Sequence, residues 1–284
     1  MSKKTAASDV VLGAARAVNL EIDGAIAQIT LNRPDTYNAI DAGMTQGLAA
    51  AIADIESMPE VRVILLKGAG KGFCSGGDLA FFASRGESLR PTVDRMLRDG
   101  HRFLEALRST RKLVVVSVHG VAAGAGLSLA VAGDFCIAAS DATFVPGYAK
   151  LGVSPDLGGT ANMTRAIGIR RAMRLYFLEE RITAAEAERL GIVSRIVEPH
   201  LLAEETRRIA RALAEIPLAA AQSTKSLLRQ ATTTPFAQQL EAELESFQAC
   251  VHTATTQSEL RRFADQAAET RRTRANPRSQ ACRS

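Results

Sequence analysis

Short apolar runs that alternate with helix-like segments are the feature that most constrains the fold of this 284-residue chain. Three of these runs, Val61–Leu66, Lys112–His119 and Phe135–Ala139, are each followed by polar or glycine-rich residues. Apolar runs of this length are typical of strands buried on both faces of a parallel sheet. Their alternation with helices predicts an α/β body that extends to about residue 200.

Local patterns predict further elements. Val18–Ile22 and Ala25–Leu31 form a predicted hairpin around Asp23-Gly24. Apolar residues of Ala42–Glu56 fall on one helical face, and Thr183-Ala-Ala-Glu186 is a capping box that opens a helix. We expect residues 81–98 to be a mobile loop with helical pieces, Gly100–Leu107 to be a helix, and residues 144–159 to be irregular.

Four regions are predicted. Residues 1–15 are expected to be a flexible leader, 16–200 the α/β core, and 201–270 a helical region with breaks at Pro217 and Pro235. Residues 271–284 contain five arginines and no acid, which predicts a disordered basic tail. Because the whole chain carries +5, the rest of it is close to neutral.

Composition excludes several classes of protein. The four cysteines form no CxxC pair, which argues against a zinc site or a disulfide framework and favours a reducing compartment. The chain has no tryptophan, which argues against base stacking with nucleic acid. No apolar run reaches the ~18 residues of a membrane span. We therefore expect a cytoplasmic protein with no metal and no membrane or nucleic-acid partner.

Two glycine-rich junctions between a strand and a helix are candidate functional loops. They are Gly72–Asp78 and Gly120–Gly126. The start of a helix leaves amide hydrogens unpaired, and two such amides that converge would form an oxyanion hole. Alone, each loop is more often a tight turn that packs two elements together, and Gly124-Ala-Gly126 with Asp141 could be taken for part of a dinucleotide site.

The order of several motifs is more specific than either loop. The motifs are Asn32-Arg-Pro34 with Asn38-Ala39, Phe73–Asp78, Gly120–Gly126, Leu151–Gly159 and Thr183–Val193. In this order they resemble the enoyl-CoA hydratase/isomerase (crotonase) superfamily. The resemblance implies an α/β spiral of ββα units with a C-terminal helical trimerisation region. It also implies an acyl-CoA thioester substrate, no cofactor besides that coenzyme A, and a homotrimer or a dimer of trimers.

The resemblance also assigns roles to residues. It places the oxyanion-hole amides at Gly77 and Ala125, and Asp78 is expected to cap or orient its loop. Arg33 and Lys71 are candidate contacts for CoA phosphates, and we expect His119 to be packed in the core. The remaining predicted substrate contacts are Cys74, Ser75, Gly76, Leu79, Phe82, Gly124, Ser128, Tyr148 and Phe263.

The chain departs from the hydratase pattern at two positions. Hydratases that it resembles use two glutamates to activate water, and Ser128 and Tyr148 stand at those positions here. Their ordinary pKa values are too high for a general base near neutral pH. Asp156 is the remaining acid, and it matches the acid/base of ring-1,2-epoxyphenylacetyl-CoA and Δ3,Δ2-enoyl-CoA isomerases. The sequence therefore predicts an acyl-CoA isomerase.

Three alternatives remain. The chain could be an enoyl-CoA hydratase of the same fold, or an acyl-CoA binder without catalytic activity. Asp156 could also be no more than the N-cap of the helix that begins near Gly158.

Overall fold

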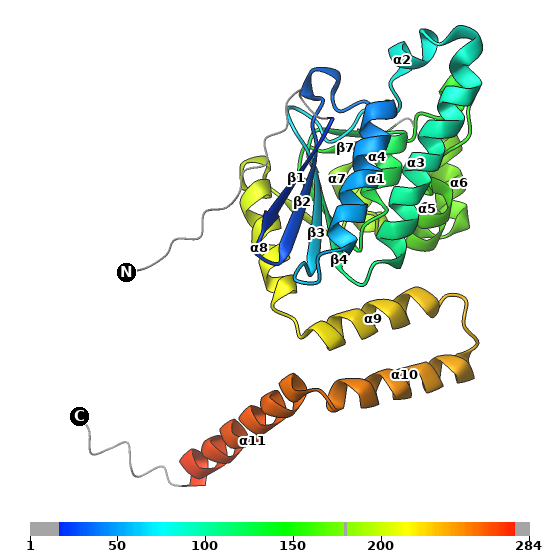
Figure 1. The fold of residues 1–284 in the computed structure, drawn as a ribbon. Helices are drawn as coiled ribbons and strands as arrows, with labels where there is room; N and C mark the ends of the chain where they lie inside the picture. Colours follow the sequence, from blue (N-terminus) through cyan, green and yellow to red (C-terminus); the bar gives the residue numbers. More distant parts are fainter. Residues whose placement is uncertain (1–16, 179–180, 276–284) are drawn as a thin grey trace. The chain divides into compact units, whose positions relative to one another are not determined.

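The computed structural model describes residues 17–178 and 181–275 (Figure 1). The chain divides into two compact units after Ala214. The first unit thus includes one helix beyond the boundary expected near residue 200. The predicted leader at 1–15 lies outside the described residues.

A six-stranded sheet in the order β1-β2-β3-β4-β6-β9 forms the centre of the first unit. Only β1 and β2 pair antiparallel, and every other neighbouring pair is parallel. Its strands are β1 (Val18–Asp23), β2 (Ile26–Leu31), β3 (Val63–Gly68), β4 (Leu113–Val118), β6 (Phe135–Ala139) and β9 (Arg195–Val197). This sheet confirms the predicted α/β class. The two turn residues of the hairpin are Gly24 and Ala25, one position later than predicted.

A three-stranded sheet in the order β5-β7-β8 lies beyond the carboxyl end of β4 in the chain. Its strands are β5 (Val121–Ala123), β7 (Thr143–Val145) and β8 (Ile182–Thr183). These strands are too short to leave a periodic signal, and none was predicted as a separate strand. They matter because β5 leads directly into the second glycine-rich junction.

Helices pack against the central sheet on both sides. Helix α8 contacts β2, β3, β4 and β6, whereas α1 contacts β1 and β2 and carries α3 on its outer side (Figure 1). The helices of the first unit are α1 (Ala42–Glu56), α2 (Leu79–Ala83), α3 (Leu89–Ser109), α4 (Ala125–Ala130), α5 (Gly159–Ile167), α6 (Ile169–Leu178), α7 (Ala184–Leu190) and α8 (Leu202–Ala214). Single 3-10 turns are η1 (Pro34–Thr36), η2 (Gly86–Ser88), η3 (Ala149–Leu151) and η4 (Pro199–Leu201).

Two predicted helices have the predicted bounds and caps. Helix α1 spans the predicted residues, and its N-cap Asp41 accepts a hydrogen bond from the Met44 amide at 2.9 Å. Helix α7 begins at the predicted capping box and ends at Gly191, whose φ of 87° is the left-handed conformation that glycine tolerates.

The stretch 81–98 is not a loop, so that prediction was wrong. Helix α3 runs from Leu89 and places Met96, Phe103 and Leu107 in its buried face. The apolar pattern of this buried face is interrupted at two positions, because Asp99 and Gly100 are also buried there. A Cβ at Gly100 would lie 2.6 Å from a methyl of Leu157, so a larger residue there would force this side chain to move.

The second unit contains α9 (Leu218–Gln230), α10 (Phe236–Val251) and α11 (Ala254–Ala275). The predicted breaks at Pro217 and Pro235 are confirmed, because each proline is the residue before a helix. Helix α11 continues through 271–275, so the predicted tail does not begin at 271, and its remainder lies outside the described residues. In the described part of the chain, no helix is both long enough and apolar enough to cross a membrane.

Candidate functional site

The two predicted glycine-rich loops lie against each other. The Cys74 amide donates to the Val121 carbonyl at 3.0 Å, and the Ala123 amide donates to the Cys74 carbonyl at 2.9 Å. Gly76 has a φ of 97°, and a Cβ there would lie 2.9 Å from the Ala123 carbonyl oxygen and 3.6 Å from the Ala125 nitrogen. The first loop therefore passes over the start of α4 at a separation that only glycine permits.

The two predicted oxyanion-hole amides are unpaired. Gly77 forms a parallel bridge with Ile40 that uses the neighbouring groups, the Gly76 carbonyl at 2.7 Å and the Asp78 amide at 2.9 Å. Ala125 is the first residue of α4, and first-turn amides have no partner within their helix. Across residues 17–178 and 181–275, neither amide donates a hydrogen bond. Two free donors on adjoining loops are what an oxyanion hole requires.

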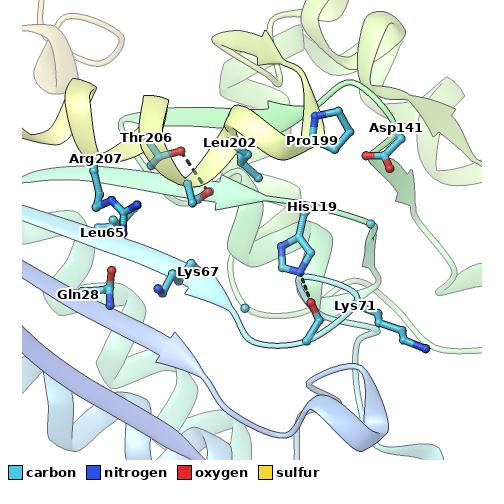
Figure 2. A pocket seen from close by; sticks show the side chains of 15 residues that line it. Gln28, Leu65, Lys67, Lys71, His119, Asp141, Pro199, Leu202, Thr206 and Arg207 are labelled. Carbon is cyan, nitrogen blue, oxygen red and sulfur yellow. Dashed lines mark hydrogen bonds between the residues drawn. The ribbon is translucent and has the colours of Figure 1, made fainter.

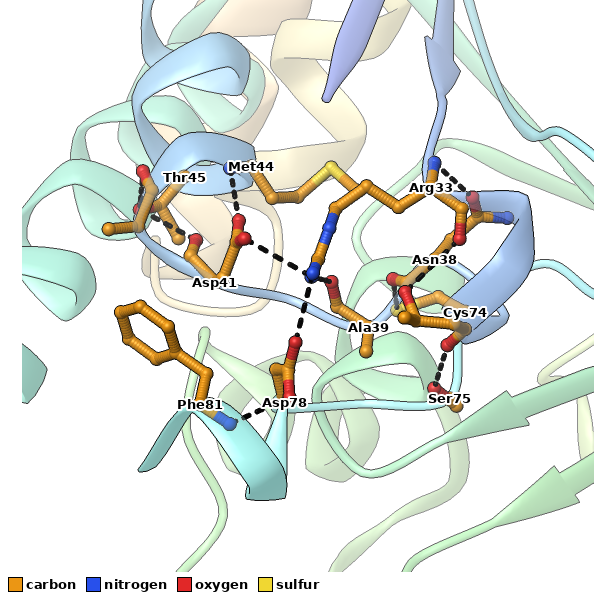
Figure 3. A network of polar contacts seen from close by, with 12 residues as sticks. Arg33, Asn38, Ala39, Asp41, Met44, Thr45, Cys74, Ser75, Asp78 and Phe81 are labelled. Atoms are coloured by element: carbon orange, nitrogen blue, oxygen red, sulfur yellow. Dashed lines mark hydrogen bonds and ion pairs between the residues drawn. The ribbon is translucent and has the colours of Figure 1, made fainter. Parts of the chain in front are cut away.

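A polar network fixes the first loop (Figure 3). The Asp78 carboxylate caps α2 by accepting from the Phe81 amide at 2.9 Å, and it also accepts from Arg33 Nη2 at 3.0 Å. Burial opposes ionisation of Asp78, but the Phe81 amide and Arg33 outweigh it and hold the pKa of this carboxyl below its ordinary value. The predicted orienting role of Asp78 is confirmed.

Arg33 holds the network together. Its guanidinium donates to the Ala39 carbonyl at 2.5 Å and pairs with Asp41 at 3.3 Å, in addition to Asp78. The guanidinium thus holds the loop, and its predicted contact with a CoA phosphate stays a prediction.

Asn38, which belongs to the first motif of the sequence, is a structural residue. Its buried side-chain amide donates to the carbonyls of Ala69, Gly72 and Phe73 at 2.8, 2.9 and 3.0 Å.

The Cys74 thiol is buried beside Asn38. Cys74 Sγ donates to the Asn38 backbone carbonyl at 3.2 Å, and burial raises the pKa of this thiol to about 12. Cys74 is therefore not a nucleophile at neutral pH.

Ser128, Tyr148 and Asp156 form one chain of hydrogen bonds. Tyr148 Oη donates to Asp156 Oδ1 at 2.6 Å and lies 3.0 Å from Ser128 Oγ. Burial raises the pKa of Asp156, and the Tyr148 hydroxyl and the charge of His101 only partly offset this effect. The three positions that the sequence singled out for acid/base chemistry therefore meet in one place.

Asp156 does not cap α5. The N-cap residue of α5 is Gly158, and no side chain caps this helix. Asp156 contributes only its backbone carbonyl, which accepts from the Gly159 amide at 2.9 Å. The cap interpretation is wrong because Leu157 and Gly158 both adopt left-handed φ angles, 46° and 69°, and turn the chain between Asp156 and the helix.

Tyr176 in α6 is a site residue that sequence reasoning missed. Its ring lies beside that of Tyr148, with 6.3 Å between centroids. Its buried hydroxyl has no hydrogen-bond partner among the residues that the structure describes, and burial and the Asp156 charge raise its pKa to about 12. A Cβ at Gly159 would lie 3.0 Å from this hydroxyl and would collide with Ser128, so Gly159 keeps the cluster open. In the sequence, Tyr176 was recognisable only as part of a helical pattern, which does not indicate a site residue.

The other predicted residues are more scattered. The Phe82 ring covers Gly77, where a Cβ would lie 2.7 Å from it, while Leu79 is 53% exposed. Ser75 donates to the Thr36 carbonyl at 3.1 Å, and the Gly124 amide donates to Val145 at 2.8 Å.

Three further predictions concern residues outside this cluster. Phe263 lies in α11 of the second unit under the Arg262 guanidinium. His119 is half-buried and lines a cavity with Lys71, so it is not packed in the core. Within the described residues, no group of His, Cys, Asp and Glu side chains could hold a metal ion.

Comparisons with known proteins show which family the chain resembles in sequence and in fold. The family model described as "Enoyl-CoA hydratase/isomerase" matches residues 21–272. The 1,2-epoxyphenylacetyl-CoA isomerase of Escherichia coli (strain K12) is 34% identical over 226 residues, which cover 78% of this chain and 85% of that protein. The (E)-benzylidenesuccinyl-CoA hydratase of Thauera aromatica is 36% identical over 209 residues, or 73% and 80% of the two chains. The crystal structure of an enoyl-CoA hydratase from Polaromonas sp. JS666 superposes with a TM-score of 0.82 at 30% identity, covering 88% of this chain and 97% of that one.

Proposed function

The chain belongs to the enoyl-CoA hydratase/isomerase family, and from this premise we propose that it is an isomerase that moves the double bond of an enoyl-CoA. The observation that carries the proposal is the single carboxylate of the cluster, Asp156, held by the Tyr148 hydroxyl at 2.6 Å. Double-bond migration needs one group that takes a proton and returns it, and one carboxylate is enough for this task.

The proposed reaction has two proton transfers. Asp156 removes a proton from C2 of a 3-enoyl thioester, and the electron pair moves onto the carbonyl oxygen to give a dienolate. The same carboxyl group then returns the proton to C4, which leaves the double bond between C2 and C3. The amides of Gly77 and Ala125 stabilise the dienolate oxygen, and losing one such donor typically costs about 3–4 kcal/mol of transition-state stabilisation.

Tyr148 is assigned a positioning role. Burial and the Asp156 charge raise the pKa of its hydroxyl far above the ordinary value, so it stays protonated and cannot act as a base. As a donor it directs one oxygen of Asp156 and leaves the other for the substrate. Burial in turn keeps the pKa of Asp156 above its ordinary value, which makes the carboxylate a better base than an exposed aspartate.

Hydration is the second candidate, and one observation favours it. Within residues 17–178 and 181–275 the buried Tyr176 hydroxyl has no hydrogen-bond partner, so it could hold the water that hydration requires. A relative that matches this chain is also named as a hydratase. An acyl-CoA binder without turnover is the remaining alternative.

Isotope labelling separates these functions. The protein is incubated with 3-enoyl-CoA and 2-enoyl-CoA substrates in ¹⁸O-labelled water and, separately, in D₂O, and the products are analysed by mass spectrometry. Isomerisation gives deuterium exchange at carbon without ¹⁸O. Incorporation of ¹⁸O at C3 at a rate that matches or exceeds migration would replace the isomerase proposal with a hydratase, and no product of either kind would leave only binding.

A further inference from the structure

Polar side chains occupy one end of the sheet face that α8 covers. Leu65 and Lys67 of β3 share a face because side chains alternate along a strand. Lys67 pairs in register with Ser117 of β4, and Leu65 pairs with Gln28 of β2. Side chains facing a packed helix are ordinarily apolar, so a lysine, a glutamine and a serine side by side form an exception.

These residues line a cavity of about 370 Å³ (Figure 2). The cavity is bounded by the carboxyl ends of β3 and β4, by the loop at Gly70 and Lys71, and by α8 through Thr206 and Arg207. His119 lies at its edge, where Nε2 is 2.9 Å from the Gly70 carbonyl. A volume of this size is within the range of small-molecule sites, about 300–1,000 Å³, and ligands of α/β proteins bind beyond the carboxyl ends of parallel strands.

The charges that line this cavity do not balance. Lys67, Lys71 and Arg207 carry three positive charges, and Asp141 is the one carboxylate of the lining. In the described part of the chain, no carboxylate lies within ion-pairing distance of these three cations. The side-chain amide of Gln28 already has a partner outside the cavity lining, since it donates to the Glu21 carboxylate at 2.7 Å.

An anion would relieve this imbalance. Like charges that face one cavity repel each other, and Lys67 is half-buried, where screening by water is weaker than at the surface. Lys67 comes from a strand and Arg207 from a helix, and the two side chains lie on the same side of the cavity, whereas the Lys71 side chain extends away from them (Figure 2). Neighbouring basic groups such as Lys67 and Arg207 bind phosphate oxygens well.

We propose that this cavity binds a small phosphate-bearing anion at a site separate from the candidate active site. None of the residues of the Ser128–Tyr148–Asp156 chain lines it. The proposal therefore does not rest on isomerase activity. The same phosphate chemistry could come from the coenzyme A moiety of the substrate, and the experiment must distinguish these two sources.

The test uses the full chain and pyrophosphate as the probe, with binding followed by calorimetry. We expect saturable binding that weakens as NaCl is raised, and a loss of affinity of about tenfold or more in Arg207→Met and in Lys67→Met, the scale of one charged hydrogen bond. Arg207 is exposed, so its substitution tests the site even if Lys67→Met does not fold. Arg111→Met is the matched control, because Arg111 is an exposed arginine that precedes β4 at the opposite end of the strand.

A second titration, with acetoacetyl-CoA at saturation, identifies the source of the phosphate. Unchanged pyrophosphate affinity supports a separate site, whereas competition would assign the cavity to coenzyme A and overturn the proposal. It is equally overturned if pyrophosphate shows no saturable binding to the unmodified protein, or if Arg111→Met weakens binding as much as Arg207→Met.

Discussion

Replacement of Asp156 by asparagine separates catalysis from stability in one variant. The amide has the shape of the carboxyl group, and its oxygen can still accept from Tyr148 Oη, which lies 2.6 Å from Oδ1. What it cannot do is take a proton from carbon. Positioned acid–base groups contribute about 10²–10⁴-fold to a rate, and at 1.36 kcal/mol for each factor of ten this equals about 3–5 kcal/mol of activation free energy.

The expected effect on stability has the opposite sign. Burial raises the folded-state pKa of Asp156 above its unfolded value near 3.8, so the native state binds the proton more tightly than the unfolded state. The free energy of unfolding therefore falls as pH rises from the unfolded pKa to the folded pKa, and the full cost is present above the folded pKa. The Asp156→Asn substitution removes this cost, and we expect the variant to be at least as stable as the unmodified protein at neutral pH.

Two assays check these expectations. Migration of the double bond of a 3-enoyl-CoA is followed by the ultraviolet absorbance of the conjugated product, and urea unfolding is measured at several pH values. The reasoning is refuted if the variant turns over at the original rate. It is also refuted if the variant loses about 0.5–2 kcal/mol of stability, which is the signature of a lost helix cap.

The same cluster and its loops give three further predictions. Tyr148→Phe removes a donor that lowers the pKa of Asp156, so the acidic limb of the kcat/KM profile should move to higher pH, and an unmoved limb would contradict the positioning role. Gly76→Ala places a Cβ 2.9 Å from the Ala123 carbonyl, so kcat should fall by about tenfold or more as the Gly77 amide shifts, whereas the control Gly24→Ala meets nothing within 4 Å and should keep full activity. Tyr176→Phe removes a buried hydroxyl that lacks a partner and should raise the free energy of unfolding by about 1–3 kcal/mol, and a lower melting temperature would show that the hydroxyl has a partner after all.

The elements with strong periodic or capping signals could be predicted from the sequence. Helix α1 and the capping box at Thr183 are defined by patterns of adjacent residues, and the structure confirms both. The sequence predicts the second half of α3, Gly100–Leu107, as a helix, but not its first half, because Asp99 and Gly100 interrupt the apolar pattern of the buried face. The strands of the small sheet consist of two or three residues, which is too short for a period to develop.

The candidate site could be predicted where a motif carried it. The loops at Gly77 and Ala125 and the acid Asp156 were found because they lie in glycine-rich motifs. Tyr176 and Lys67 could not be found, since each stands in an ordinary helix or strand and gains its meaning only from tertiary packing. His119 was misplaced for the same reason, because the end of a buried strand opens here into a cavity.

The hydrogen-bond chain explains how two hydroxyl groups could change the reaction of a shared fold. A carboxylate at position 128 or 148 would stand within hydrogen-bond range of the Asp156 chain and would compete with Asp156 for a single proton. Ser128 and Tyr148 are hydroxyl groups, and burial raises the pKa of Tyr148, so Asp156 is the one carboxyl group of the chain. A second acid could be introduced with Ser128→Glu. The larger side chain would collide with Gly159, because Ser128 lies so close to this residue that a Cβ at Gly159 has no room. We therefore expect that substitution to abolish isomerisation without creating hydration, and measurable ¹⁸O incorporation by this variant would show that the carboxylate count alone decides the chemistry.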